Sequence, residues 1–334
     1  MLNTKIIKTA NFLIKLLIIT FAFGFIAQRF FIKYDTSSFF LNFSKLFTEE
    51  KTIIFLVIIV CMMLLNWALE ACKWKMLIRK IEKVSFIKSF MAVWAGITIG
   101  AFTPNRTGEY FGRAFILEQA NRWEGVFITT IGSFSQLLIT LIFGTISGFL
   151  FLNNAFEPVT HKLLYVLLFV TSLLALILMI LFFKISWVKK FFFKIIPQKY
   201  YLFRSHLEVY SYYSIKELLE VIFLSTLRYA IFTVQFFLLM YLCHIEMTFF
   251  EGLVFISFLY LITTCLPTIA LTELGVRGSV SIFLLEIYYQ SNPIFMDEAI
   301  SNMFMASFFI WFVNLIIPAL IGGIFVFKLK FFRK

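Results

Sequence analysis

Two short stretches of the sequence place charged residues in otherwise apolar surroundings. Each contains a glutamate followed four residues later by an arginine, namely Glu109 and Arg113 in the first and Glu273 and Arg277 in the second. Arginine offers a planar fork of N–H donors that matches phosphate and carboxylate groups. Charged residues at membrane depth are functional candidates by default. The spacing therefore suggests a buried anion site, although such a Glu–Arg pair can also serve only to neutralise buried charge.

The residues before each motif predict a break in the backbone. Proline cannot donate to the hydrogen-bond ladder of a helix, so each proline should end one half-helix. Threonine is a common N-cap, so each threonine should cap a second half-helix, whose N-terminus favours an anion. The residues expected to form these breaks and caps are Pro104, Thr107 and Gly108 in FTPNRTGEYFGRAF, and Pro267 and Thr272 in LPTIALTELGVRG.

The composition indicates which elements must position these charges. Of the 334 residues, 61% are hydrophobic and only 14% are charged, whereas soluble domains carry about a quarter charged residues. A helix needs about 20 apolar residues to cross a bilayer. Six segments meet this requirement: 12–32, 52–72, 125–152, 163–183, 218–242 and 299–327. Two further apolar regions, 88–119 and 249–287, are broken at the two motifs. We expect an all-α polytopic membrane protein with a single membrane domain over 1–334.

The positions of lysine and arginine indicate how these segments are threaded. If both broken regions enter and leave on one face, as re-entrant helical hairpins, the basic clusters at 73–88, 184–216 and 328–334 all lie in the cytoplasm. If either region crossed completely, the 184–216 cluster or the basic tail would lie outside. The 29–51 loop is the exception, since it is expected outside and still carries basic residues. The pattern predicts six full spans, two re-entrant hairpins and cytoplasmic termini.

The order of elements predicts an internal duplication. Residues 1–152 and 153–334 contain the same succession of spans and hairpins in opposite orientations, which is the inverted repeat common among secondary transporters. The glutamates of the two motifs lie 164 residues apart, close to half the chain. The segment 185–216 mixes lysines with aromatic residues and is expected to be an amphipathic connector at the cytoplasmic interface.

Further polar residues lie within the predicted spans. Arg228 lies midway along 218–242 and should face the same cavity as the motifs, with Gln235 two turns further on the same face. Gln136 suits either helix–helix hydrogen bonding or substrate contact. Glu70 is expected to pair with a nearby lysine, and Asn314 to be a packing residue. The predicted substrate-binding residues are Arg106, Glu109, Arg113, Arg228, Gln235, Glu273 and Arg277.

The first motif resembles a known family. TPNRTGEYFGRAFIL resembles the Pro-x-Arg-x-Gly-Glu signature, with its downstream arginine, of the lysylphosphatidylglycerol synthase transmembrane-region family, whose members are also called flippase-like. LPTIALTELGVRGSV and RYAIFTVQFFLL resemble the second half of that family. The resemblance implies a bacterial cytoplasmic-membrane protein that handles lipids or lipid-linked intermediates. The two-domain synthases carry a soluble aminoacyl-transfer domain after the membrane region. This chain has no room for it after the last span, so lysyl transfer is not expected.

Three functions agree with these features. A flippase would hold an anionic or lipid-linked headgroup between the two hairpins and move it by rocking one repeat against the other. A membrane-embedded enzyme would require carboxylates from separate hairpins to meet, and a scaffold would bind envelope-synthesis enzymes. No cofactor or metal is expected, because the four cysteines show no metal-binding spacing. Nucleic acid is not an expected partner, because the basic residues lie in loops beside apolar spans. We expect the flippase-like function, with membrane lipids as partners.

Overall fold

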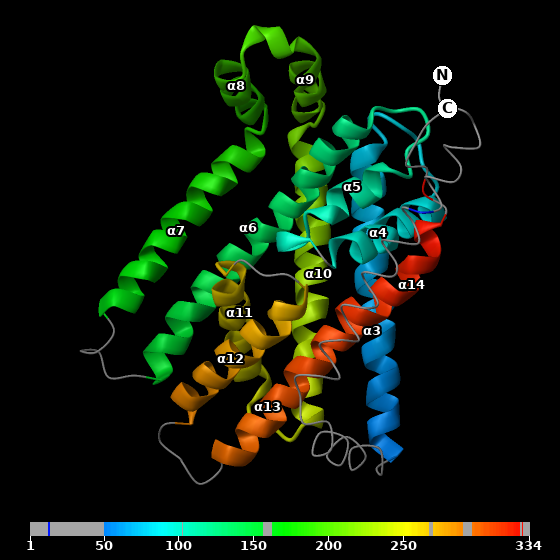
Figure 1. Cartoon of the computed structure of the whole chain (residues 1–334). Coiled ribbons are helices and arrows are strands. Elements are labelled where there is room, and N and C mark those ends of the chain that lie inside the picture. Colours follow the sequence, from blue (N-terminus) through cyan, green and yellow to red (C-terminus); the bar gives the residue numbers. More distant parts are fainter. Residues whose placement is uncertain are drawn as a thin grey trace.

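The computed structural model describes residues 50–101, 103–155, 162–266, 270–289 and 296–327, together with Leu13 and Leu329. Every regular element in these ranges is a helix (Figure 1). The predicted span at 12–32, apart from Leu13, lies outside the described residues.

Five helices of the described chain are long and apolar enough to cross a membrane. Four are single α-helices: α3 (Glu50–Ile78), α6 (Arg122–Ala155), α7 (Lys162–Phe183) and α10 (Ile215–Leu242). The fifth consists of α13 (Met296–Trp311), a π-helical turn (Phe312–Ile316) and α14 (Ile317–Val326). The π turn comes just before Pro318, which has no N–H for the ladder. Five of the predicted spans are therefore present as long apolar helices, and the chain is a multi-pass membrane protein.

Two pairs of helices occupy the regions in which the sequence predicts breaks. The first pair is α4 (Phe86–Gly100) and α5 (Gly108–Ala114), joined through a 3₁₀ turn, η1 (Pro104–Arg106). The second pair is α11 (Phe249–Thr264) and α12 (Ala270–Tyr288). Helices α4 and α11 have 15 and 16 residues, fewer than the roughly 20 that a span requires. In Figure 1 the first pair lies towards one end of the bundle and the second pair towards the other.

The connector between α7 and α10 projects beyond the bundle as two short helices, α8 (Ser186–Ile195) and α9 (Tyr201–His206) (Figure 1). Large apolar side chains such as Phe191 and Tyr201 are exposed on it. Lys189 pairs with Glu208 at its base. Exposed aromatic side chains beside lysines are typical of a segment that lies at a bilayer surface.

Each short pair packs closely against a long helix of the other half of the chain. Helix α4 contacts α14, and α11 contacts α6. A Cβ atom on Gly322 of α14 would lie 2.1 Å from the Trp94 carbonyl oxygen of α4, and one on Gly144 of α6 would lie 2.6 Å from Leu261 of α11. Small residues of this kind let the backbones of membrane helices approach one another.

The contact between α4 and α14 leads to a first prediction. Gly322→Ala would push a methyl group into the α4 backbone, and overpacking of a well-packed core typically costs about 1–3 kcal/mol. We expect a clear fall in the midpoint of thermal unfolding of the detergent-solubilised protein. Gly275→Ala is the matched control, because a Cβ atom there would meet nothing within 4 Å. Equal stability of the two variants would contradict this packing.

A carboxylate fixes the end of the first pair. Glu82 lies between α3 and α4, and its two oxygens accept hydrogen bonds from the backbone N–H groups of Glu118, Gln119 and Ala120, at 2.8 to 3.1 Å. Burial alone would raise the pKa of Glu82, but these hydrogen bonds to the ionised form outweigh it and hold the pKa below its usual range. The segment that leads from α5 into α6 is thereby tied to the start of α4.

The lowered pKa of Glu82 makes this tie dependent on pH. A carboxyl group whose pKa is depressed by folding adds stability above its unfolded pKa, and that stability is lost as the pH falls through the folded pKa. We expect Glu82→Gln to lower the unfolding midpoint at neutral pH, and the difference from the wild type to shrink as the pH is lowered below about 4.5. Glu118→Gln, at a side chain that is 53% exposed, should show no such convergence. A difference for Glu82→Gln that is independent of pH would argue against this role.

Candidate functional site

The turn between α4 and α5 has an unusual backbone. The sequence predicted that Pro104 ends α4. Helix α4 instead ends at Gly100, and Pro104 begins the 3₁₀ turn. The next two residues, Asn105 and Arg106, have φ angles of 47° and 55°. Non-glycine residues in this left-handed region are uncommon, and they cluster where surrounding structure imposes a conformation for function. The turn places Arg106 between Glu109 of its own helix pair and Glu273 of α12.

Thr107 precedes α5 as predicted, but neither predicted threonine caps its helix through its side chain. Thr107 has helical φ and ψ angles and makes no side-chain capping hydrogen bond. Thr103 takes this role instead, because its Oγ1 accepts a hydrogen bond of 2.8 Å from the N–H of Gly108. In the second pair, α12 already includes Ala270, so Thr272 lies within the helix and does not cap it. Pro267 lies outside the described residues.

Glycines allow α5 to lie directly on α4. A Cβ atom on Gly108 would be 2.6 Å from the Ile99 carbonyl oxygen, and one on Gly112 would be 2.7 Å from Cα of Gly96. A Cβ atom on Gly100 would likewise meet the side chain of Glu109. The close approach places the Glu109–Arg113 motif across α4 and towards the middle of the bundle.

Glu70 of α3 is the centre of a buried ion-pair network. Its carboxylate lies 2.9 Å from Nζ of Lys73, and it also pairs with Arg113 of α5 and Arg228 of α10. The side chains of Glu70 and Arg113 are both 5% exposed. The sequence predicted only the lysine partner. A single carboxylate therefore connects three elements that are distant in the sequence.

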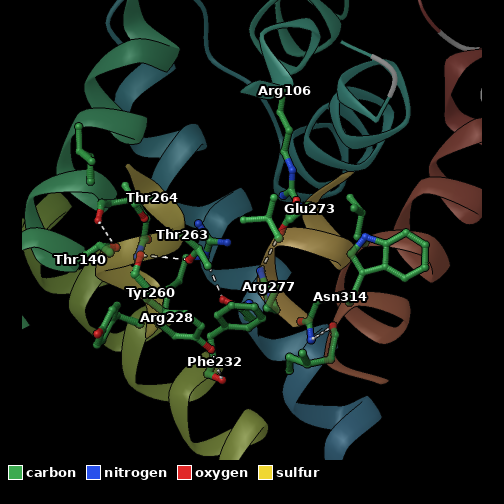
Figure 2. A pocket seen from close by; sticks show the side chains of 18 of the residues that line it. Arg106, Thr140, Arg228, Phe232, Tyr260, Thr263, Thr264, Glu273, Arg277 and Asn314 are labelled. Atoms are coloured by element: carbon green, nitrogen blue, oxygen red, sulfur yellow. Dashed lines mark hydrogen bonds and ion pairs between the residues drawn. The ribbon is translucent and has the colours of Figure 1, made fainter. Parts of the chain in front are cut away.

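The network continues from α5 to α12. Arg113 lies 3.0 Å from Glu109, Glu109 lies 3.9 Å from Arg106, and Arg106 lies 2.6 Å from Glu273. Glu273 in turn lies 2.7 Å from Arg277. Figure 2 shows Arg106 reaching from the turn of the first pair to Glu273 at the start of α12. The two motifs identified in the sequence thus belong to one network.

The charges of the network do not balance. Among the residues that the structure describes, it contains three carboxylates, on Glu70, Glu109 and Glu273, and five cations, on Lys73, Arg106, Arg113, Arg228 and Arg277. In their ordinary charge states these groups carry two net positive charges within an apolar bundle. A surplus of positive charge in a site of low polarity favours an anionic ligand.

A cavity of about 540 Å³ opens beside the network. Its walls come from α3, α6, α10, α11, α12, α13, the π turn and the turn of the first pair. Four of the predicted binding residues line it, namely Arg106, Arg228, Glu273 and Arg277. Glu109 and Arg113 belong to the network without lining the cavity, and Gln235 does not line it either.

Arg277 has hydrogen-bond donors to spare. Its guanidinium group lies 5.7 Å from the ring centre of Phe232 and 5.9 Å from that of Tyr260. Nη2 donates to Glu273, whereas Nε and Nη1 are buried without a partner. Unpaired buried donors are rare in proteins and require an explanation such as a missing ligand or water. Two donors of a buried arginine are therefore available to an anion.

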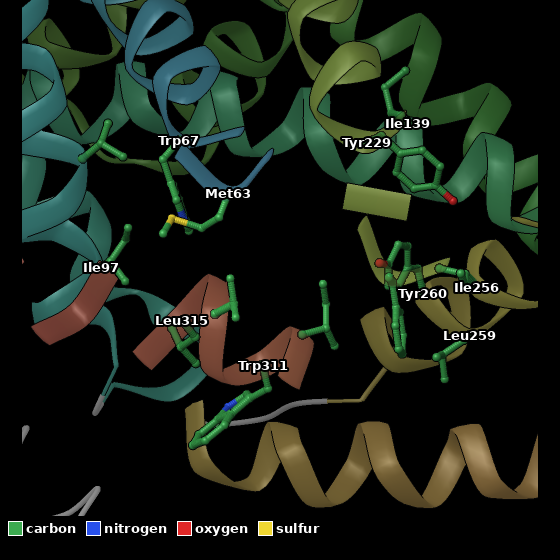
Figure 3. Packing of buried hydrophobic residues seen from close by; sticks show 14 of the residues in the cluster. Met63, Trp67, Ile97, Ile139, Tyr229, Ile256, Leu259, Tyr260, Trp311 and Leu315 are labelled. Carbon is green, nitrogen blue, oxygen red and sulfur yellow. The ribbon is translucent and has the colours of Figure 1, made fainter. Parts of the chain in front are cut away.

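Aromatic and aliphatic side chains surround the charged part of the cavity. The Arg228 guanidinium lies 5.3 Å from the ring centre of Trp67, and its Nε donates to Asn66. Trp67, Tyr260 and Trp311 line the cavity and also belong to the buried apolar cluster (Figure 3). An apolar cavity with a few convergent polar groups is the usual form of a small-molecule site.

Glu70 and Asn66 are the site residues whose importance the sequence analysis missed. A signal was present, because Asn66, Glu70 and Lys73 recur at helical spacing on one face of an otherwise apolar span.

The family model described as "Lysylphosphatidylglycerol synthase TM region" matches residues 12–295. No curated protein and no solved structure matches the chain.

Proposed function

Because the chain belongs to the lysylphosphatidylglycerol synthase transmembrane-region family, we propose that it binds the phosphate of an anionic lipid, or of a lipid-linked intermediate, and moves it between the leaflets. The observation that carries this proposal is the cavity that Arg106, Arg228 and Arg277 share, in which two guanidinium nitrogen atoms of Arg277 are buried and unpaired. Arginine forks bind phosphate oxygens well. The acyl chains would remain in the lipid.

The two short helix pairs act in this proposal as re-entrant hairpins of an inverted repeat, with halves 1–152 and 153–334. The packing supports it, because α4 of the first half lies on α14 and α11 of the second half lies on α6. This exchange of partners is what a two-fold related arrangement would produce. Rocking of one repeat against the other would expose the cavity to each side of the membrane in turn.

In this mechanism, Glu273 binds the two arginines when no ligand is bound. Its two carboxylate oxygens bridge Arg106 and Arg277, as two phosphate oxygens would. An incoming phosphate would compete for both arginines and separate Arg106 from Glu273. That ion pair joins the two helix pairs, so its loss would free one pair to move relative to the other.

We place the protein in the bacterial cytoplasmic membrane, with the basic loops and both termini in the cytoplasm. The connector that contains α8 and α9 would then lie on the anionic inner leaflet. Membrane lipids are the proposed partners, and envelope-synthesis enzymes would supply or consume a lipid-linked substrate.

The proposal is tested with purified protein in liposomes that contain fluorescent phosphatidylglycerol. The wild type should move the labelled lipid between leaflets, and Arg277→Gln should slow this movement at least about tenfold, the effect of losing one charge-assisted hydrogen bond. Arg204→Gln on α9 is the control, since it removes an arginine outside the network. A well-folded Arg277→Gln protein with the wild-type rate would refute the assignment.

A further inference from the structure

The cavity contains unpaired acceptors as well as unpaired donors. Oδ1 of Asn314 and Oε1 of Gln136 are buried without a partner, and both residues line the cavity. Figure 2 shows Asn314 on the same cavity as Arg277 and Glu273. A phosphate diester only accepts hydrogen bonds, so it can satisfy Arg277 but neither of these oxygens. A ligand that satisfies the whole cavity must also donate.

The orientation of the Asn314 amide is set by its neighbours. Its Nδ2 donates to Oε1 of Gln235 (2.9 Å) and to the Ile310 carbonyl oxygen (3.2 Å). The Gln235 amide is itself held in one orientation, because its Nε2 donates a hydrogen bond of 2.8 Å to the Ile59 carbonyl oxygen. The amide nitrogen of Asn314 is therefore occupied, and its oxygen is the atom without a partner. Gln235 acts as a positioning residue for Asn314.

Two threonines add to the acceptors of the cavity wall. Thr140 donates its hydroxyl proton to the backbone carbonyl oxygen of Gln136 (3.0 Å), and Thr263 donates to the backbone carbonyl oxygen of Leu259 (2.9 Å). Since a hydroxyl group has one proton, each oxygen faces the cavity only as an acceptor. The cavity lining thus presents acceptors on α6, α11 and the π turn, together with the donors of its arginines.

The donors on the ligand could be hydroxyl groups or an ammonium group, and the charges distinguish these two. Among the described residues that line the cavity, Glu273 is the one carboxylate, and it is already paired with Arg106 and Arg277. With a net positive charge in the adjacent network, an ammonium group would be repelled. Neutral hydroxyl groups satisfy the acceptors without this penalty.

The size of the cavity agrees with a headgroup larger than phosphate. Its volume of about 540 Å³ lies within the range of about 300–1,000 Å³ that is typical for small-molecule sites, and a phosphate alone would leave most of it empty. Building on the proposed function, we infer that the headgroup is a phosphate ester of a neutral polyol, such as a sugar or cyclitol ring. The arginines hold its phosphate, and Asn314, Gln136 and the threonines accept from its hydroxyl groups.

Binding of short-chain lipids to the detergent-solubilised full chain tests this inference. Dioctanoyl phosphatidylinositol carries a phosphate and a polyol, dioctanoyl phosphatidic acid carries phosphate alone, and dioctanoyl phosphatidylethanolamine carries an ammonium group. A purely electrostatic site prefers phosphatidic acid, because it has the greater negative charge. We expect phosphatidylinositol to bind about tenfold more tightly than phosphatidic acid, the worth of one or two additional hydrogen bonds.

Two variants test which residues cause the preference for phosphatidylinositol over phosphatidic acid. Asn314→Leu and Gln136→Leu should each reduce the ratio of the two affinities, whereas Arg277→Gln should weaken both lipids. Gln136 lies within the long helix α6, so its variant provides the test if Asn314→Leu does not fold. Equal or tighter binding of phosphatidic acid or phosphatidylethanolamine would overturn the inference, as would an unchanged ratio in the folded leucine variants. Absence of binding by every phosphate-bearing lipid would instead refute the proposed function.

Discussion

Replacing Glu70 with glutamine should destabilise the protein more than any other single change to the ion-pair network. Glu70 is the shared partner of Lys73, Arg113 and Arg228, and the side chain of Lys73 is only 1% exposed. Removing one partner of a buried ion pair costs about 3–5 kcal/mol, because the remaining charge stays desolvated. We expect a large fall in the unfolding midpoint of the detergent-solubilised protein, and poor recovery of monodisperse material.

The same substitution at an exposed glutamate shows whether the loss of stability is specific to Glu70. Glu118→Gln removes a charge that is 53% exposed and lies 3.7 Å from Lys88, and exposed ion pairs contribute about 1 kcal/mol or less. It should leave the midpoint nearly unchanged. Combining Glu70→Gln with Arg228→Gln removes one of the stranded cations and should recover part of the lost stability. Wild-type stability of Glu70→Gln would show that the network does not hold the helices together.

Glu273→Gln should strengthen the binding of anionic lipid. Glu273 occupies both Arg106 and Arg277, so a neutral amide there releases two cavity arginines for the ligand. Each charge-assisted hydrogen bond contributes about 1.5–3 kcal/mol, and we therefore expect anionic lipid to bind about ten- to a hundredfold more tightly. Transport in liposomes should slow at the same time, because ligand release requires a carboxylate that reclaims the arginines. The measurements are lipid affinity in detergent and labelled-lipid movement in liposomes.

The first motif supplies the control for this variant. Glu109 holds the equivalent position before Arg113, but it does not line the cavity. Glu109→Gln should leave lipid affinity within a few-fold of the wild type, whatever its effect on stability. If both variants tightened binding equally, net charge alone would be responsible. Weaker binding by Glu273→Gln would mean that Glu273 supports the ligand and does not compete with it.

The long helices were predictable because hydrophobic length is a local property of the sequence. Five of the six expected spans are present among the described residues, and the two ExxxR motifs lie in one network as their matching positions suggested. The caps were less predictable. With the left-handed backbone at Asn105 and Arg106, the side chain of Thr103 accepts the hydrogen bond from the start of α5. A propensity rule that favours the nearest threonine cannot anticipate that turn.

The partners of Glu70 could not be predicted from spacing alone. Lys73 is a neighbour on the same helix, but Arg113 and Arg228 reach Glu70 only through the packing of α5 and α10. Gln235 is a second case in which packing decides the contacts. Its place on the same helical face as Arg228 suggested a cavity residue, whereas its amide is used to join α3 to the π turn.

The packing of α4 on α14 bears on how the chain is made. Thr98 of α4 donates to the Ala319 carbonyl oxygen, 221 residues further along the chain. While a ribosome is still translating the intervening helices, α4 has been made, but the helix that packs on it and the Glu273 partner of Arg106 do not yet exist. Biogenesis must therefore tolerate a half-built intermediate with ionised groups in or near the bilayer.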